Sequence, residues 1–142
     1  MSTYADTSFL VSLYAPDANS DVAIARMREA ELPILLTPLT ELELVNAMSL
    51  RLFRQDLRSS EVKAAQSLIR RDLTEGVLQL KPLPLGVFDR AKRLSLHRTP
   101  QLGTRTLDIL HVASALELRA DTFYTFDHSQ EALARAEGLI VI

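Results

Sequence analysis

The sequence contains no cysteine among its 142 residues. This absence excludes a disulfide scaffold, a thiolate zinc site and a cysteine nucleophile, and it fits a reducing cytosol. Glycine and proline are scarce as well, with 4 and 6 copies. Because 47% of the residues are hydrophobic, the chain has enough apolar side chains to bury a core, and we do not expect it to be disordered.

The chain also lacks an excess of either charge, since its formal net charge is −2. Without a basic coat, any contact with nucleic acid must come from local patches. The basic residues number 16, of which 3 are lysines, so the remaining 13 are arginines. Guanidinium groups suit bidentate contacts with phosphate, which makes arginine the residue to look for in such patches.

No long hydrophobic run is present. The apolar run Phe9–Leu13 is interrupted by Ser12, preceded by Asp6 and not flanked by a basic stretch. We therefore expect neither a signal peptide nor a membrane span, and we predict a cytoplasmic protein. Repeats, low-complexity tracts and linkers are absent too, so we predict a single domain over residues 1–142.

Short apolar segments alternate with segments of helical character. Strands are predicted at residues 2–6, 33–36, 77–80, 122–126 and 139–142. Helices are predicted at 7–15, 19–30, 37–54, 59–73, 85–96, 104–118 and 127–136, with a loop at 98–103. Short apolar strands without clean alternation are typical of a buried parallel sheet. We therefore predict an α/β fold, a three-layer α/β/α sandwich around a central parallel sheet of about five short strands.

One predicted helix, 37–54, shows its start and its face in the sequence. Thr37 is placed to cap it and Pro38 occupies its first position. Its apolar residues recur at helical spacing, which predicts a buried face. That face consists of Leu39, Leu42, Val45 and either Met48 or Ser49.

Four acidic residues follow predicted strands or stand near the starts of helices: Asp6, Glu43, Asp108 and Asp127. Right-handed crossovers bring the carboxyl ends of parallel strands and the starts of helices to one edge of the sheet, where such folds bind ligands. Carboxylates gathered at one point repel each other unless a cation is bound. The pattern therefore predicts a cation site at this edge.

Local explanations exist for each acid taken alone. Asp6 and Asp127 are suited to cap the helices that follow them, and Asp108 could complement a helix dipole. Glu43 could close a capping box with Thr40. Within that helix Glu41 is a rival to Glu43, but it points about 160° away around the helix axis.

These residues lie in segments that resemble the PIN-domain family, and within it the VapC-like toxins. The similar segments span nearly the whole chain in the same order: Tyr4–Val11, Leu39–Ala47, Thr106–Leu116 and Phe123–Asp127, followed by Leu133-Ala134 and Glu137–Leu139. The resemblance implies that the four acids hold one or two divalent cations, Mg²⁺ with Mn²⁺ as a substitute. It also implies that Thr125, the small hydroxyl residue beside the last acid, orients a water molecule in catalysis.

The activity implied by the resemblance is that of a metal-dependent endoribonuclease. It would hydrolyse RNA phosphodiesters with a metal-activated water and act as the toxin of a VapBC-type toxin–antitoxin pair. The implied partners are RNA, a cognate small antitoxin and a second copy of the chain, with the apolar faces of helices 7–15 and 37–54 as the expected dimer surfaces.

Other functions stay open. The chain could be a PIN nuclease of RNA processing or decay, or a non-catalytic module that binds a partner in its groove. A phosphatase with Asp6 as nucleophile is disfavoured, because such enzymes usually place a second aspartate two residues later, where Ser8 stands.

For substrate contacts, the segment 97–105 leads into the Asp108 helix, so Arg98 and Arg105 are expected to reach phosphates near the metal. His111 stands one turn after Asp108 and could bond to that acid or to a phosphate. A second basic patch consists of Arg51, Arg54 and Arg58. Few aromatic residues are placed for base stacking, which favours recognition of structured RNA by its shape.

Overall fold

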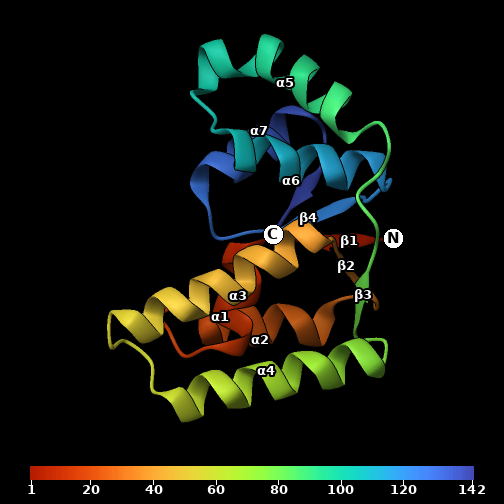
Figure 1. Cartoon of the computed structure of the whole chain (residues 1–142). Helices are drawn as coiled ribbons and strands as arrows, with labels where there is room; N and C mark the ends of the chain where they lie inside the picture. The colour runs from red at the N-terminus through yellow and green to blue at the C-terminus, as the bar shows by residue number, and fades with distance from the viewer.

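A five-stranded parallel sheet lies between two layers of helices in the computed structural model, which describes residues 1–142 (Figure 1). The strands are β1 (Thr3–Ala5), β2 (Ile34–Leu36), β3 (Leu78–Leu80), β4 (Thr122–Tyr124) and β5 (Ile140–Val141). Their order in the sheet is β3-β2-β1-β4-β5, and every neighbouring pair is parallel. The predicted α/β fold is confirmed, including its five short strands.

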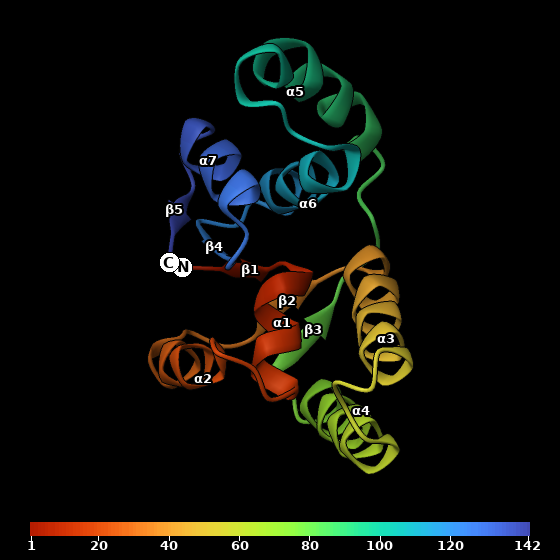
Figure 2. The ribbon, with the colours of Figure 1, turned by 90° about the vertical axis from the view of Figure 1, so that its left-hand side faces the viewer.

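Seven helices cover the two faces of this sheet (Figure 2). They are α1 (Thr7–Tyr14), α2 (Ser20–Glu29), α3 (Pro38–Phe53), α4 (Ser59–Thr74), α5 (Val87–Leu102), α6 (Thr106–Glu117) and α7 (His128–Ala136). Helices α1 to α4 lie on one side of the sheet and α5 to α7 on the other. None of them combines the length and the apolar character that a membrane span needs.

Successive strand residues supply the two hydrophobic cores, because side chains alternate between the faces of a sheet. In β1, Tyr4 packs in the core beneath α6 and α7, whereas Ala5 packs in the core with α1 and α3. In β4 the same alternation places Phe123 in the first core and Tyr124 in the second. The strands are therefore buried on both faces, as their apolar composition predicts.

The loop predicted at residues 98–103 is wrong. Helix α5 continues to Leu102 and contains Pro100 in its last turn. Proline removes one backbone hydrogen bond from a helix, but Pro100 is exposed, where water can replace that bond. The helix ends at Gly103, which adopts the left-handed conformation (φ 63°) and donates its N–H to the carbonyl of Thr99 (2.8 Å).

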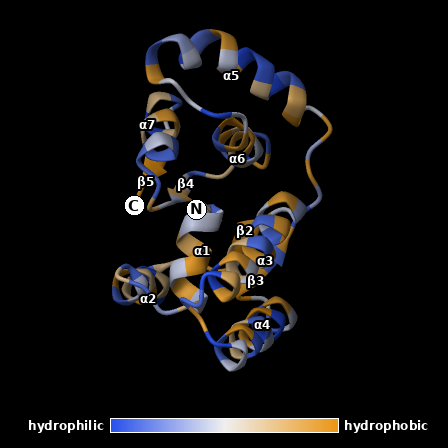
Figure 3. Cartoon of the chain, turned by 60° about the vertical axis from the view of Figure 1, so that its left-hand side comes forward, coloured by the Kyte–Doolittle hydropathy of each residue, from blue (hydrophilic) through white to orange (hydrophobic).

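The predicted buried face of α3 is confirmed at Met48 but wrong at Leu42 and Val45. Leu42 and Val45 are 67% and 49% exposed, whereas the buried residues are Thr40, Leu44 and Met48. The prediction counted apolar residues only, but Thr40 is drawn into the core by a hydrogen bond between its hydroxyl and that of Tyr4 (3.1 Å). Figure 3 shows hydrophobic residues along the ribbon of α3.

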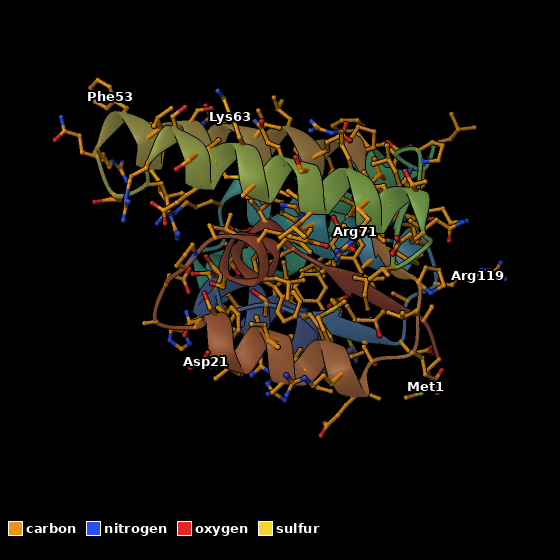
Figure 4. The ribbon with its side chains drawn as sticks, turned by 90° about the horizontal axis from the view of Figure 1, so that it is seen from below. Met1, Asp21, Phe53, Lys63, Arg71 and Arg119 are labelled. Atoms are coloured by element: carbon orange, nitrogen blue, oxygen red, sulfur yellow. The ribbon has the colours of Figure 1, made fainter.

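Helix α1 has no free apolar face, contrary to the prediction that it offers a dimer surface. Its apolar residues are packed in the core that α1 shares with α2, α3 and α4. At the end of α3, by contrast, Phe53 is 83% exposed and extends away from the fold (Figure 4). Of the two helices predicted to form a dimer surface, only α3 presents apolar side chains outside.

Candidate functional site

The strand order reverses between β1 and β4. From β1 the chain crosses to β2 and then β3 on one side, and it returns to β4 and β5 on the other. Loops leaving two such strands run in opposite directions, and open α/β sheets bind ligands at this topological switch point. Asp6 directly follows β1, and Thr125 and Asp127 follow β4, so all three lie at this point.

Asp6 is completely buried at the start of α1. Its Oδ1 accepts hydrogen bonds from the backbone N–H of Phe9 (2.9 Å) and the hydroxyl of Ser8 (2.7 Å). Its Oδ2 accepts one from the hydroxyl of Thr125 (2.5 Å). Burial raises the pKa of Asp6 above its ordinary value, although these three donors oppose the shift. A bound cation would favour the charged form of this carboxyl group.

Thr125 joins Asp6 to Asp127. The Thr125 hydroxyl donates to Asp6 and accepts a hydrogen bond from the backbone N–H of Asp127 (2.9 Å). Asp127 in turn caps α7, because its Oδ1 accepts from the backbone N–H of Gln130 (2.9 Å). Capping and membership of the acidic edge are therefore compatible roles for the same carboxylate.

Asp108 reaches this group through Gln130. The side-chain amide of Gln130 donates to Asp108 Oδ1 (3.2 Å), while its backbone donates to Asp127. The amide oxygen of Gln130 is buried and has no hydrogen-bond partner in the protein. Gln130 was not among the residues predicted from the sequence, and only its position three residues after Asp127 could have pointed to it.

Glu43 is held from two sides. Its Oε1 accepts from the hydroxyl of Thr7 (3.0 Å) and contacts Nε2 of His111. Burial alone would raise the pKa of Glu43, but the hydrogen bond and charge of His111, together with the bond from Thr7, hold it below its ordinary value. Glu41, the rival in the same helix, is exposed and lies beside a groove between α3 and α4.

The structure places the side chain of His111 inside the fold. Its side chain is buried, and its Nδ1 is hydrogen-bonded to the hydroxyl of Tyr4 (2.8 Å). Its acidic partner is Glu43 rather than Asp108, the partner considered from the sequence. The partner of a buried helical residue depends on which strand and helix pack against it. The spacing of residues along α6 alone therefore could not predict that His111 contacts Glu43.

The basic residues predicted to contact substrate differ in whether their side chains are already bonded within the protein. Arg98 donates from Nε to Glu137 (2.7 Å) and from Nη2 to the carbonyl of Ala136 (3.0 Å), which ties α5 to the end of α7. Arg105 is exposed at the start of α6, next to Asp108. In the second patch, the guanidinium of Arg51 pairs with Asp17 (3.1 Å), whereas Arg54 and Arg58 are exposed.

The donor atoms at this edge fit a hard divalent cation that keeps part of its water. They are carboxylate oxygens, which Mg²⁺ and Mn²⁺ prefer. No three Asp, Glu or His side chains lie close enough together to form a metal cage by themselves. Mg²⁺ is usually held by one or two carboxylates and several waters, and the unpartnered oxygen of Gln130 could accept a hydrogen bond from such a water.

Comparison with known proteins identifies the family. The model of the PIN domain matches residues 3–136. Among solved structures, VapC20 of Mycobacterium tuberculosis, a sarcin-ricin loop cleaving toxin, superposes with a TM-score of 0.67 at 20% identity, over 92% of this chain and 94% of its own. FitAcB of Neisseria gonorrhoeae superposes with a TM-score of 0.69 at 16% identity, over 99% and 96%. No curated protein matches the sequence.

Proposed function

The chain belongs to the PIN-domain family, and from this premise we propose that it is a metal-dependent endoribonuclease. The observation that carries the proposal is the buried carboxylate of Asp6 at the switch point of the sheet. It is bonded through Thr125 to the loop that carries Asp127. Glu43 stands in the second turn of α3, and Asp108 in the first turn of α6. The three hydrogen bonds to Asp6 bring no positive charge, and a bound cation would offset the remaining cost of burying its charge.

We propose that Asp6, Glu43, Asp108 and Asp127 hold Mg²⁺, or Mn²⁺ in its place. When bound, the metal supplies charge stabilisation at the phosphoryl group and lowers the pKa of a water. The protein contributes fixed geometry. Donors on both oxygens of Asp6 fix its plane, and contacts with Thr7 and His111 fix Glu43.

Thr125, expected to take part in catalysis, is proposed as a positioning residue that acts through Asp6. Its hydroxyl donates to Asp6 and so holds the carboxylate that stands deepest in the site. The exposed Arg105, near Asp108, is proposed to contact RNA phosphate. The guanidinium of Arg105 would place positive charge next to the carboxylate edge, where the substrate phosphate must approach.

We further propose that the protein is the toxin of a toxin–antitoxin pair and acts in the cytoplasm. VapC20, whose fold it shares, is a sarcin-ricin loop cleaving toxin. A small antitoxin and a second copy of the chain are the proposed protein partners, and the apolar residues exposed on α3, such as Leu42 and Val45, are the surface proposed for the dimer.

One observation favours a rival, a non-catalytic PIN module that binds a partner. The protein side chains alone form no cage of three metal ligands. A module of this kind would bind no Mn²⁺ in calorimetry and would cleave no RNA, whereas the proposed nuclease does both.

The test is RNA cleavage by the purified protein with Mg²⁺ or Mn²⁺, compared with EDTA and with Asp6→Asn. Cleavage that needs both the metal and Asp6 supports the nuclease. Cleavage that survives EDTA or the substitution in a folded protein would overturn the proposed site. For the toxin role, induced expression should arrest growth, and Asp6→Asn should relieve the arrest.

A further inference from the structure

A polar cavity of about 410 Å³ adjoins the carboxylate edge. Thr125, which bonds to Asp6, forms part of its wall together with the following Phe126. Arg26 of α2 and Arg135 of α7 face the same space. Only 3 of the 9 lining residues are hydrophobic, and the volume lies in the range of cavities that bind small ligands. We call this space the Arg26 cavity.

The guanidinium of Arg26 is fixed but has no anionic partner. It lies over the ring of Phe126, 4.9 Å from the ring centre, and that ring is stacked in turn on Phe9 (5.6 Å between centres). Its Nη1 is buried without a hydrogen-bond partner, and Arg26 takes part in none of the ion pairs of the molecule. Buried donors in proteins nearly always form a hydrogen bond, so we expect a ligand to supply an acceptor for this nitrogen.

The charges around the cavity favour an anion. Glu131 is the one acidic side chain in the lining, and it already accepts a hydrogen bond from Arg135 (3.1 Å). The α-carboxylate of Ile142 belongs to the lining as well, but neither it nor Glu131 forms an ion pair with Arg26. The ring of Phe126 is covered by Phe9 and Arg26, so it is not free to stack on a base. A phosphate group, which a planar guanidinium can bond through two nitrogens, matches this lining better than a base does.

We propose that the Arg26 cavity binds a backbone phosphate of the RNA strand that crosses the carboxylate edge, beside the phosphate that is cleaved. This inference rests on the proposed nuclease function. It adds a contact that fixes the register of the strand, because a phosphate seated in the cavity sets which neighbouring phosphate faces Asp6 and Asp127. The strand thus meets a cationic pocket next to an acidic site.

The test is binding of a fluorescein-labelled RNA hairpin with a single-stranded loop, followed by fluorescence anisotropy in EDTA over a range of NaCl concentrations. Arg26→Met should weaken binding about tenfold, the loss expected for one charge-assisted contact. It should also reduce the slope of log affinity against log salt by about 0.7, the value for one phosphate of a single strand. Arg28→Met is the matched control, since Arg28 is exposed on the same helix and lies outside the cavity.

A second variant keeps the test decisive if Arg26→Met does not fold. Asn19→Asp places a carboxylate in the lining at the cap of α2, a position that aspartate suits well, and it should also weaken binding. The proposal is overturned if the wild-type protein binds no RNA, or if the folded variants bind RNA as tightly as wild type. It is also overturned if Arg28→Met loses as much RNA affinity as Arg26→Met. Cleavage with Mg²⁺ is measured separately. If the wild-type protein binds RNA through Arg26 but does not cleave it, the proposed nuclease activity is overturned, whereas the proposed phosphate site is retained.

Discussion

His111 and Glu43 are in direct contact, Nε2 against Oε1, although they lie 68 residues apart in the chain. The other ring nitrogen of His111 is bonded to the hydroxyl of Tyr4, which also bonds to Thr40. A buried chain of hydrogen bonds from β1 through α6 to α3 thus fixes the orientation of one proposed metal ligand. His111 is therefore a positioning residue in our account, and it acts through Glu43.

Replacing His111 by leucine should impair the site more than the fold. The change leaves Glu43 with Thr7 as its remaining partner, and losing a residue that orients a ligand typically costs 10-fold to 100-fold in metal affinity or activity. Mn²⁺ affinity by calorimetry and the RNA cleavage rate measure this effect. Tyr4→Phe is the control, because it keeps the contact between His111 and Glu43 and should have a smaller effect. Unchanged affinity and rate in His111→Leu would contradict the positioning role.

Asp6→Asn should raise the thermal stability of the metal-free protein while abolishing cleavage. The pKa of Asp6 is raised by burial, so its ionised form at neutral pH is a cost to the folded state. Removing the charge should raise Tm by a few degrees, the shift that about 1 kcal/mol gives in a domain of this size. The gain should shrink as the pH falls towards 3.8, because wild-type Asp6 then becomes neutral too.

Thermal melting in EDTA across this pH range measures the difference. The exposed Asp56 supplies the control, since Asp56→Asn should leave Tm unchanged. A lower Tm for Asp6→Asn than for wild type at neutral pH would show that the charged carboxylate stabilises the fold, against our account.

Glu43 should show the opposite dependence on pH. Its folded-state pKa lies below the ordinary value of 4.5, so its ionised form stabilises the folded protein above that pH. Glu43→Gln should therefore lower the free energy of unfolding at pH 7, and the gap from wild type should narrow as the pH falls below about 4.5. Urea denaturation at a series of pH values measures the gap. A gap that stays constant down to pH 3 would contradict the role of this carboxylate.

Arg98 and Arg105 should have different roles: Arg98 should stabilise the fold, and Arg105 should contact the substrate. Arg98→Ala removes the contacts with Glu137 and Ala136 and should cost up to about 1 kcal/mol of stability, as partly exposed pairs do, with RNA affinity unchanged. Arg105→Ala should weaken RNA binding and leave stability unchanged. Chemical denaturation and RNA anisotropy on both variants decide between these roles, and weaker RNA binding by Arg98→Ala alone would reverse them.

The sheet and its acidic edge could be predicted from the sequence because both follow from local patterns. Apolar segments such as Ile34–Leu36 identify the strands, and the rule for parallel crossovers places Asp6 and Asp127 at one edge. No contact between distant residues has to be known for either step.

The features that the sequence did not reveal depend on such distant contacts. Thr40 is buried because of Tyr4, and Gln130 joins the site because Asp108 lies across from α7. The end of α5 was placed too early, because nothing in the sequence shows that the exposed last turn tolerates Pro100. Arg26 needed the fold to place it over Phe126.

The central claim, that carboxylates at the switch point hold the metal for RNA cleavage, is tested most directly by two glutamates of α3. Cleavage of a labelled RNA with Mg²⁺ should be lost in Glu43→Gln and retained in Glu41→Gln, because Glu43 faces the site and Glu41 is exposed beside the α3–α4 groove. Both variants remove one charge from the same helix, so net charge cannot explain a difference. Equal activity of the two variants, each shown to be folded, would contradict the account.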